Sequence, residues 1–165
     1  MACESLDTIK GAILLEKRGI AFYKSSAAAT SSKAVAQLFR TLSEEEVKHQ
    51  AWLERIFVEM ATEGRTTGFP VDAHDPMLAE VFTEALKKEI GAASYEAAAI
   101  SAAMALEQRA VDYYSKGAEG AGDPGCRKLF TILADWEKTH MELLARLDRE
   151  LQTSIWNDNA FWPSI

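Results

Sequence analysis

Apolar residues recur every three or four positions along most of the chain, the spacing that places them on one face of an α-helix. This periodicity predicts four long helices, over residues 5–29, 32–63, 94–118 and 123–151. Ser32 stands where an N-cap is preferred and Gly64 where a helix can end, which sets the bounds of the second helix. Four amphipathic helices in 165 residues predict an all-α fold, a four-helix bundle around one core.

The connection between the second and third helices is too long for a tight turn. Residues 64–74 lack helical periodicity, and Asp75 and Pro76 then read as an N-cap followed by proline at the first helical position. We predict a short extra helix from there to about Ile90, before Gly91. A crossover of this length carries the chain back along the bundle, so the second and third long helices should be parallel.

The C-terminal residues differ from the rest in composition. We predict a bundle domain over residues 1–152 and a tail over residues 153–165. The tail contains Trp156, Phe161 and Trp162, which is rich in aromatic residues for a free end. It is expected to pack on the bundle or on a second subunit, with a docking peptide for a larger assembly as the alternative.

Six polar residues interrupt the apolar faces of the four helices. They are Glu16, Glu46, His49, Glu107, Glu137 and His140. Each lone Glu precedes a Glu-x-x-His motif by 30 residues, and a shift of 91 residues superposes the first three positions on the last three. The chain has only three histidines, and two of them stand in its only two Glu-x-x-His motifs. A single motif of this kind is usually a coincidental surface pair, but its repetition at core-facing positions indicates a binuclear metal site.

The same shift of 91 residues matches many other positions. Examples are Leu15 with Leu106, Tyr23 with Tyr114, Phe39 with Phe130, Leu42 with Leu133 and Ala12 with Ala103. Two similar helix pairs can pack about an approximate twofold axis, so that equivalent side chains converge at the centre of the bundle. Each alanine precedes a lone Glu by one helical turn, where a small side chain leaves room for an ion and its water.

The residue types suit a pair of divalent metal ions. Residues three apart lie on one side of a helix, so Glu46 with His49, and Glu137 with His140, can each share an ion. Mixed carboxylate and imidazole ligands suit Fe(II), Mn(II) or Zn(II). Four buried carboxylates without cations would cost several kcal/mol each. Two divalent ions would balance their charge.

Two tyrosines lie close to the predicted site. Tyr23 and Tyr114 each follow the lone Glu of their half by seven residues, two turns along the same helix face. They are candidates for a hydrogen bond to the opposing carboxylates or for a redox role in catalysis. Plain core tyrosines with a satisfied hydroxyl are an equal alternative.

Charge and cysteine content narrow the class of protein. A net charge of −7 argues against a nucleic-acid partner, and no run of 18 apolar residues predicts a membrane segment. Cys3 and Cys126 form neither a disulfide framework nor a CxxC metal motif, so we expect Cys126 to be a small buried or idle thiol. The N-terminus lacks a basic region followed by an apolar run, and we therefore expect a location in a reducing cytoplasm.

The doubled pattern of a Glu followed by Glu-x-x-His resembles the ferritin-like superfamily, in particular the rubrerythrin group of di-iron carboxylate proteins. The resemblance covers about residues 5–151. It implies a ferritin-like bundle in which the six residues are iron ligands, with Glu46 and Glu137 bridging. Tyr23 matches a tyrosine that rubrerythrins keep. Met104 stands where rubrerythrins proper have a further Glu, and the rubredoxin domain with its two CxxC pairs is missing.

The resemblance implies an oxidoreductase of the ferroxidase or peroxidase type, in which two iron ions react with O2 or hydrogen peroxide. Reduction would then need an external donor such as a rubredoxin, and a homodimer is the expected assembly. Two alternatives remain open. One is a non-catalytic iron-binding or iron-handling protein, and the other is a di-iron oxygenase of a small organic substrate, which would need an apolar pocket near Ala103 and Met104.

Overall fold

The computed structural model describes residues 6–64, 86, 90, 94–122, 124–158 and 162–163. The helices in this part of the chain are α1 (Leu6–Ala29), α2 (Lys33–Glu63), α5 (Tyr95–Gly120) and α6 (Pro124–Trp156). The predicted all-α fold is confirmed, and three of the four helices begin and end within two residues of the predicted bounds. The exception is α6, which continues five residues beyond the predicted end at Leu151.

Local capping explains the bounds of α2 and the start of α5. The Ser32 side chain accepts a hydrogen bond from the Val35 backbone N–H at 3.1 Å, and Ser94 caps α5 in the same way through Ala97. Gly64 ends α2 with φ of 70°, and its N–H donates to the Met60 carbonyl at 3.2 Å. Glycine adopts this left-handed conformation without the steric cost that a side chain would bring.

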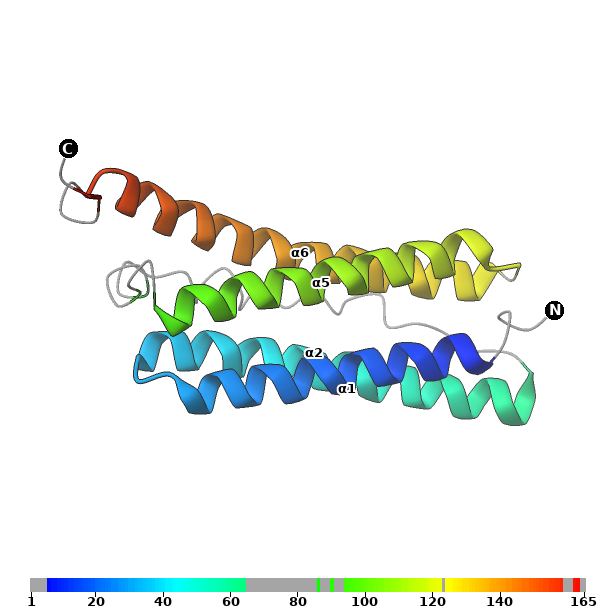
Figure 1. Cartoon of the computed structure of the whole chain (residues 1–165). Coiled ribbons are helices and arrows are strands. Elements are labelled where there is room, and N and C mark those ends of the chain that lie inside the picture. Colours follow the sequence, from blue (N-terminus) through cyan, green and yellow to red (C-terminus); the bar gives the residue numbers. More distant parts are fainter. Residues whose placement is uncertain are drawn as a thin grey trace.

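The four helices form two antiparallel hairpins that lie against each other (Figure 1). Helix α1 packs along α2, and α5 packs along α6, while α1 and α5 provide the contact between the hairpins. Helices α2 and α5 run in the same direction, as the long crossover between them predicts. The predicted short helix of that crossover lies almost entirely outside the described residues. Leu86 and Ile90 are described, and both are buried in the core.

The core consists of two apolar clusters, and the internal repeat places equivalent residues in opposite clusters. Tyr23 and Phe39 belong to one cluster, with ring centroids 6.0 Å apart, and Tyr114 and Phe130 form the same stacked pair in the other at 6.2 Å. Ala103 and Ala12 are likewise divided between the two, each fully buried. The approximate twofold relation that the 91-residue shift predicts is therefore present in the packing.

The C-terminal end is partly helical rather than an irregular tail. Because α6 extends to Trp156, residues 153–156 continue the last helix. Trp156 is 76% exposed, and its ring meets that of Trp162 edge to face with 5.4 Å between centroids. Phe161 lies outside the described residues. The division into a bundle and a separate tail stays a prediction.

Cys126, near the start of α6, is fully buried and disulfide-bonded. Burial agrees with the prediction for this residue, but the idle thiol that the sequence favoured is wrong. In the described ranges no helix carries an apolar stretch of the length and hydropathy that a bilayer span requires.

Candidate metal centre

The structure brings all six predicted side chains together at the middle of the bundle, one or two from each helix. They form the Glu/His cluster: Glu16 from α1, Glu46 and His49 from α2, Glu107 from α5, and Glu137 and His140 from α6. None is more than 4% exposed, and Glu137 is fully buried. Four carboxylates at this depth, inside a layer between two apolar clusters, would not persist without a compensating charge.

The cluster divides into two overlapping groups of metal-ligand type. Glu16 and His49 belong to one group and Glu107 and His140 to the other, while Glu46 and Glu137 belong to both. In each group one atom per residue lies within 4.8 Å of the others. The two shared carboxylates are thus placed where ligands common to two ions would lie.

The histidine nitrogens define the two halves of the centre. The Nδ1 atom of His49 lies 3.0 Å from Glu137, 3.6 Å from Glu46 and 3.7 Å from Glu16. The Nδ1 atom of His140 lies 3.2 Å from Glu46, 3.3 Å from Glu137 and 3.7 Å from Glu107. Each imidazole therefore directs the same atom at three carboxylates, in two equivalent arrangements.

The donor atoms at the centre of the cluster lack hydrogen-bond partners. This holds for both histidine Nδ1 atoms, for both carboxylate oxygens of Glu137 and for Oε1 of Glu46. Their separations are short, but the angles are not those of an N–H donating to a carboxylate. Buried polar atoms are nearly always satisfied in folded proteins. Donor atoms that face one another across a common space without bonding fit coordination to metal ions.

Electrostatics divides the carboxylates into two kinds. Burial, together with the charges of Glu46 and Glu137, raises the pKa of Glu16 and of Glu107 well above the ordinary carboxyl value. Burial also acts to raise the pKa of Glu46 and Glu137, but hydrogen bonding with Glu16 and contacts with the histidines lower the pKa of Glu46, and contacts with the histidines lower that of Glu137. Burial opposes protonation of His49 and His140, yet the facing carboxylates raise the pKa of each imidazole well above its ordinary value. Metal ions would have to displace these protons.

Tyr23 and Tyr114 connect the two halves of the bundle. The Tyr23 hydroxyl on α1 donates a hydrogen bond to Glu107 on α5, and the Tyr114 hydroxyl on α5 donates the equivalent bond to Glu16 on α1. Burial and the charge of the facing carboxylate raise the pKa of both phenols well above the ordinary value. The phenols are therefore neutral donors, and each makes the hydrogen bond to an opposing carboxylate that was one of the alternatives left open by the sequence.

Removing either hydroxyl should weaken metal binding without abolishing it. Replacing Tyr23 or Tyr114 by Phe leaves one terminal carboxylate without its orienting donor, and loss of such an outer partner typically costs about 10–100-fold in metal affinity. Competition with a coloured chelator measures the change. Tyr113→Phe is the matched control, because the Tyr113 hydroxyl donates to the Thr8 carbonyl at 2.8 Å, away from the cluster. Equal affinities for all three variants would contradict an orienting role.

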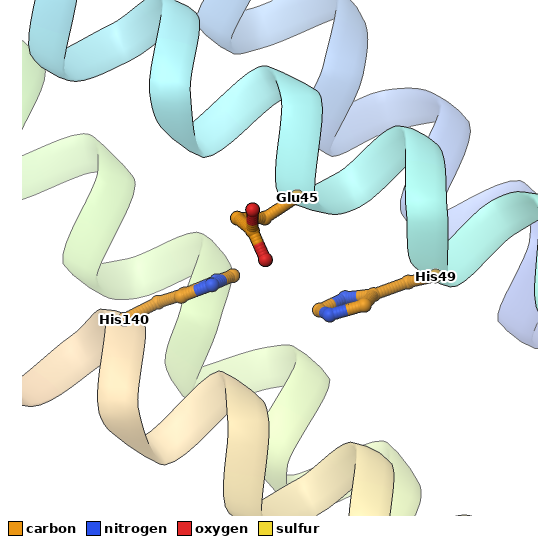
Figure 2. Close-up of side chains that lie close together, drawn as sticks. All are labelled: Glu45, His49 and His140. Atoms are coloured by element: carbon orange, nitrogen blue, oxygen red, sulfur yellow. The ribbon is translucent and has the colours of Figure 1, made fainter. Parts of the chain in front are cut away.

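Glu45 is a further member of the site that the sequence did not single out. It is 7% exposed and forms a group with His49 and His140, in which the ligand-type atoms lie within 4.8 Å of one another. Figure 2 shows the Glu45 carboxylate reaching from α2 into the space between the two imidazoles. The carboxylate also pairs with Lys48 at 2.6 Å. A carboxylate beside a ligating imidazole can fix the orientation of the ring.

A small cavity of about 10 Å³ lies between α1 and α5, beside the cluster. It is lined on one side by Glu16, Gly19 and Glu46 and closed by apolar side chains that include Leu106 and Ala110. A Cβ at Gly19 would meet the side chain of Glu46 at 3.5 Å. The cavity holds about one water molecule, so it is too small for an organic substrate.

A four-helix bundle with a buried layer of four Glu and two His, arranged as two groups that share two carboxylates, defines the class of binuclear carboxylate proteins. The rubrerythrin family model matches residues 7–148, and the chain belongs to that family. The predicted resemblance and the ferritin-like bundle are thus confirmed. Family and cluster together fit a di-iron site.

A solved structure, that of a hypothetical protein from Pyrococcus furiosus, is also similar to this chain. The two share 25% sequence identity, and the match covers 91% of this chain and 92% of the other with a TM-score of 0.63. This similarity agrees with the fold and adds no activity. Comparison with curated proteins finds no match.

Proposed function

We propose that the chain is a di-iron oxidoreductase that reacts with O2 or hydrogen peroxide. The observation that carries the proposal is the pair of overlapping ligand groups that share Glu46 and Glu137, together with the missing hydrogen-bond partners of both histidine Nδ1 atoms, both Glu137 oxygens and Glu46 Oε1. Glu16 with His49 would hold one ion and Glu107 with His140 the other. Mn(II) and Zn(II) fit the same ligand types, and the family favours iron.

The chemistry that bound iron supplies is the transfer of electrons to the oxidant. The protein contributes the rest. Glu46 and Glu137, which belong to both ligand groups, would contribute ligands to both ions, while the two imidazoles would each hold one ion through Nδ1. Tyr23 and Tyr114 hold the terminal carboxylates in position through their hydroxyls. The surrounding apolar clusters exclude bulk water, which strengthens each of these interactions.

The size of the adjacent cavity supports a small oxidant over an organic substrate. This disfavours the oxygenase alternative. A non-catalytic iron-binding role uses the same ligands and is separated from the leading proposal by reactivity alone. An external electron donor such as a rubredoxin, a homodimer and a cytoplasmic location complete the proposal. They rest on family resemblance and sequence rather than on the geometry of the cluster.

Anaerobic titration with Fe(II) followed by addition of O2 or hydrogen peroxide tests the proposed activity. We expect about two iron ions per chain, in line with the two ligand groups, and a new visible absorption after the oxidant is added. The double variant Glu46→Gln with Glu137→Gln removes both shared carboxylates. Its matched control is Glu44→Gln, which changes an exposed neighbour. Iron that binds but reacts with neither oxidant would leave the non-catalytic alternative.

A further inference from the structure

Four aromatic rings form a continuous parallel stack that ends in the Glu/His cluster. The ring stack consists of Trp52, Trp136, His49 and His140, in that order. Centroid distances along it are 4.7, 4.8 and 5.6 Å, with interplanar angles of 13°, 18° and 12°. The Trp136 indole from α6 lies between two rings from α2, so the stack crosses the boundary between the hairpins. Both indoles are half-buried, whereas both imidazoles are buried.

The internal repeat does not account for the ring stack. The residue equivalent to Trp136 in the first half is Glu45, and the residue equivalent to Trp52 in the second half is Leu143. The equivalent of the Trp52–Trp136 pair across the approximate twofold axis is therefore Leu143 on α6 and Glu45 on α2, so the repeated packing of the bundle does not demand indoles at these positions. The ring stack gives only one side of the centre a connection of aromatic rings toward the surface.

We propose that Trp52 and Trp136 form a route for single electrons between the protein surface and the metal centre. The inference rests on the proposed function, because the route needs a redox-active ion held by His49 or His140. Indole rings are among the side chains most readily oxidised by one electron, and parallel rings in contact let their π-systems overlap. Transfer through the protein weakens steeply with distance, so a ring that contacts His49 directly is favourably placed.

Electrons balance along this route in single steps. A one-electron donor at the surface, such as a small reduced iron–sulfur protein, loses one electron, and one ferric ion becomes ferrous. Two such transfers restore both ions. In the opposite direction, an indole that has lost an electron and its N–H proton is refilled by an electron from a ferrous ion and a proton from water. That reverse step is the one that can be observed directly.

Flash photolysis can detect this step through the tryptophan radical itself. The chain has four tryptophans, so Trp156→Phe with Trp162→Phe leaves only those of the ring stack. A photogenerated tris-bipyridine ruthenium(III) complex then oxidises an indole, and the radical absorption is followed with time in metal-free, Zn(II)-loaded and Fe(II)-loaded protein under anaerobic conditions. We expect Fe(II) to shorten the radical lifetime at least about tenfold while Zn(II) has little effect.

Variants of the ring stack decide whether Trp136 is the connection. In the same background, Trp136→Phe should abolish most of the acceleration by Fe(II), whereas Trp52→Phe, which keeps Trp136 against His49, should retain it. If Trp136→Phe lowers the iron content, its radical lifetime is not informative and the test rests on Trp52→Phe. Loss of the acceleration by Fe(II) in Trp52→Phe overturns the inference.

Iron analysis before each flash distinguishes failure of the electron route from failure of the proposed function. Bound iron with an unchanged radical lifetime overturns the electron route and leaves the proposed function intact. Absence of bound iron in the parent protein overturns the proposed function and the route with it.

Discussion

Replacing Glu46 or Glu137 by Gln should remove both metal ions, whereas replacing Glu16 or Glu107 by Gln should remove one. Glu46 and Glu137 belong to both ligand groups, and each of the other two carboxylates belongs to a single group. Glutamine keeps the volume of the side chain but offers one neutral oxygen, which is a poor bridge between two cations. The expected content of about two ions per chain falls to near zero in the Glu46 and Glu137 variants and to about one in the Glu16 and Glu107 variants.

Metal analysis after anaerobic loading and desalting measures these contents, and circular dichroism establishes that each variant is folded. Glu44→Gln is the control, because Glu44 precedes the cluster residue Glu46 by two positions on α2 and is exposed. Glu16→Gln and Glu107→Gln should fold well, since the raised pKa of both carboxyls makes the neutral side chain a close mimic. Retention of one ion in Glu46→Gln would show that Glu46 serves a single ion.

The ligand positions could be predicted from sequence because a helix leaves little freedom at its core face. Once Glu16 and Glu46 lie on apolar stripes of adjacent helices, the helical period fixes the direction in which both point. Tyr23 followed from the same argument, two turns further along that face. The 91-residue repeat then supplied the partner helices, which the separate clusters around Phe39 and Phe130 confirm.

The residues beside the ligands could not be predicted in the same way. Glu45 and Trp136 each precede a shared carboxylate by one position, where a side chain can face solvent, a neighbouring helix or the cluster, depending on small rotations of the helix. Burial of Glu45 and stacking of Trp136 on His49 depend on the packing of α2 against α6. That packing involves residues far apart in the chain. It also breaks the repeat, so the shift that located the ligands gave no signal here.

Metal loading should raise the midpoint of thermal unfolding by about 10–20 °C. At free metal concentrations about 100 times the dissociation constant, each ion contributes about 2.7 kcal/mol to the stability of the folded state. Two ions add about 5 kcal/mol, and in a chain of this size each kcal/mol raises the midpoint by about 2–4 °C. The cluster joins all four helices across the hairpin boundary, where α1 and α5 otherwise supply the main contact.

Thermal unfolding followed by circular dichroism, with and without Fe(II) or redox-inert Zn(II) under anaerobic conditions, measures this shift. Glu46→Gln should unfold at one temperature regardless of metal, because it lacks a shared ligand of both ions. Glu16→Gln should show roughly half of the shift of the parent chain, since one of two equal contributions remains. A parent chain whose midpoint stays constant while metal analysis reports two bound ions would mean that metal binds equally well to the unfolded chain. In that case the cluster would not be a preformed site, and the bound ions would not be the charges that compensate its buried carboxylates.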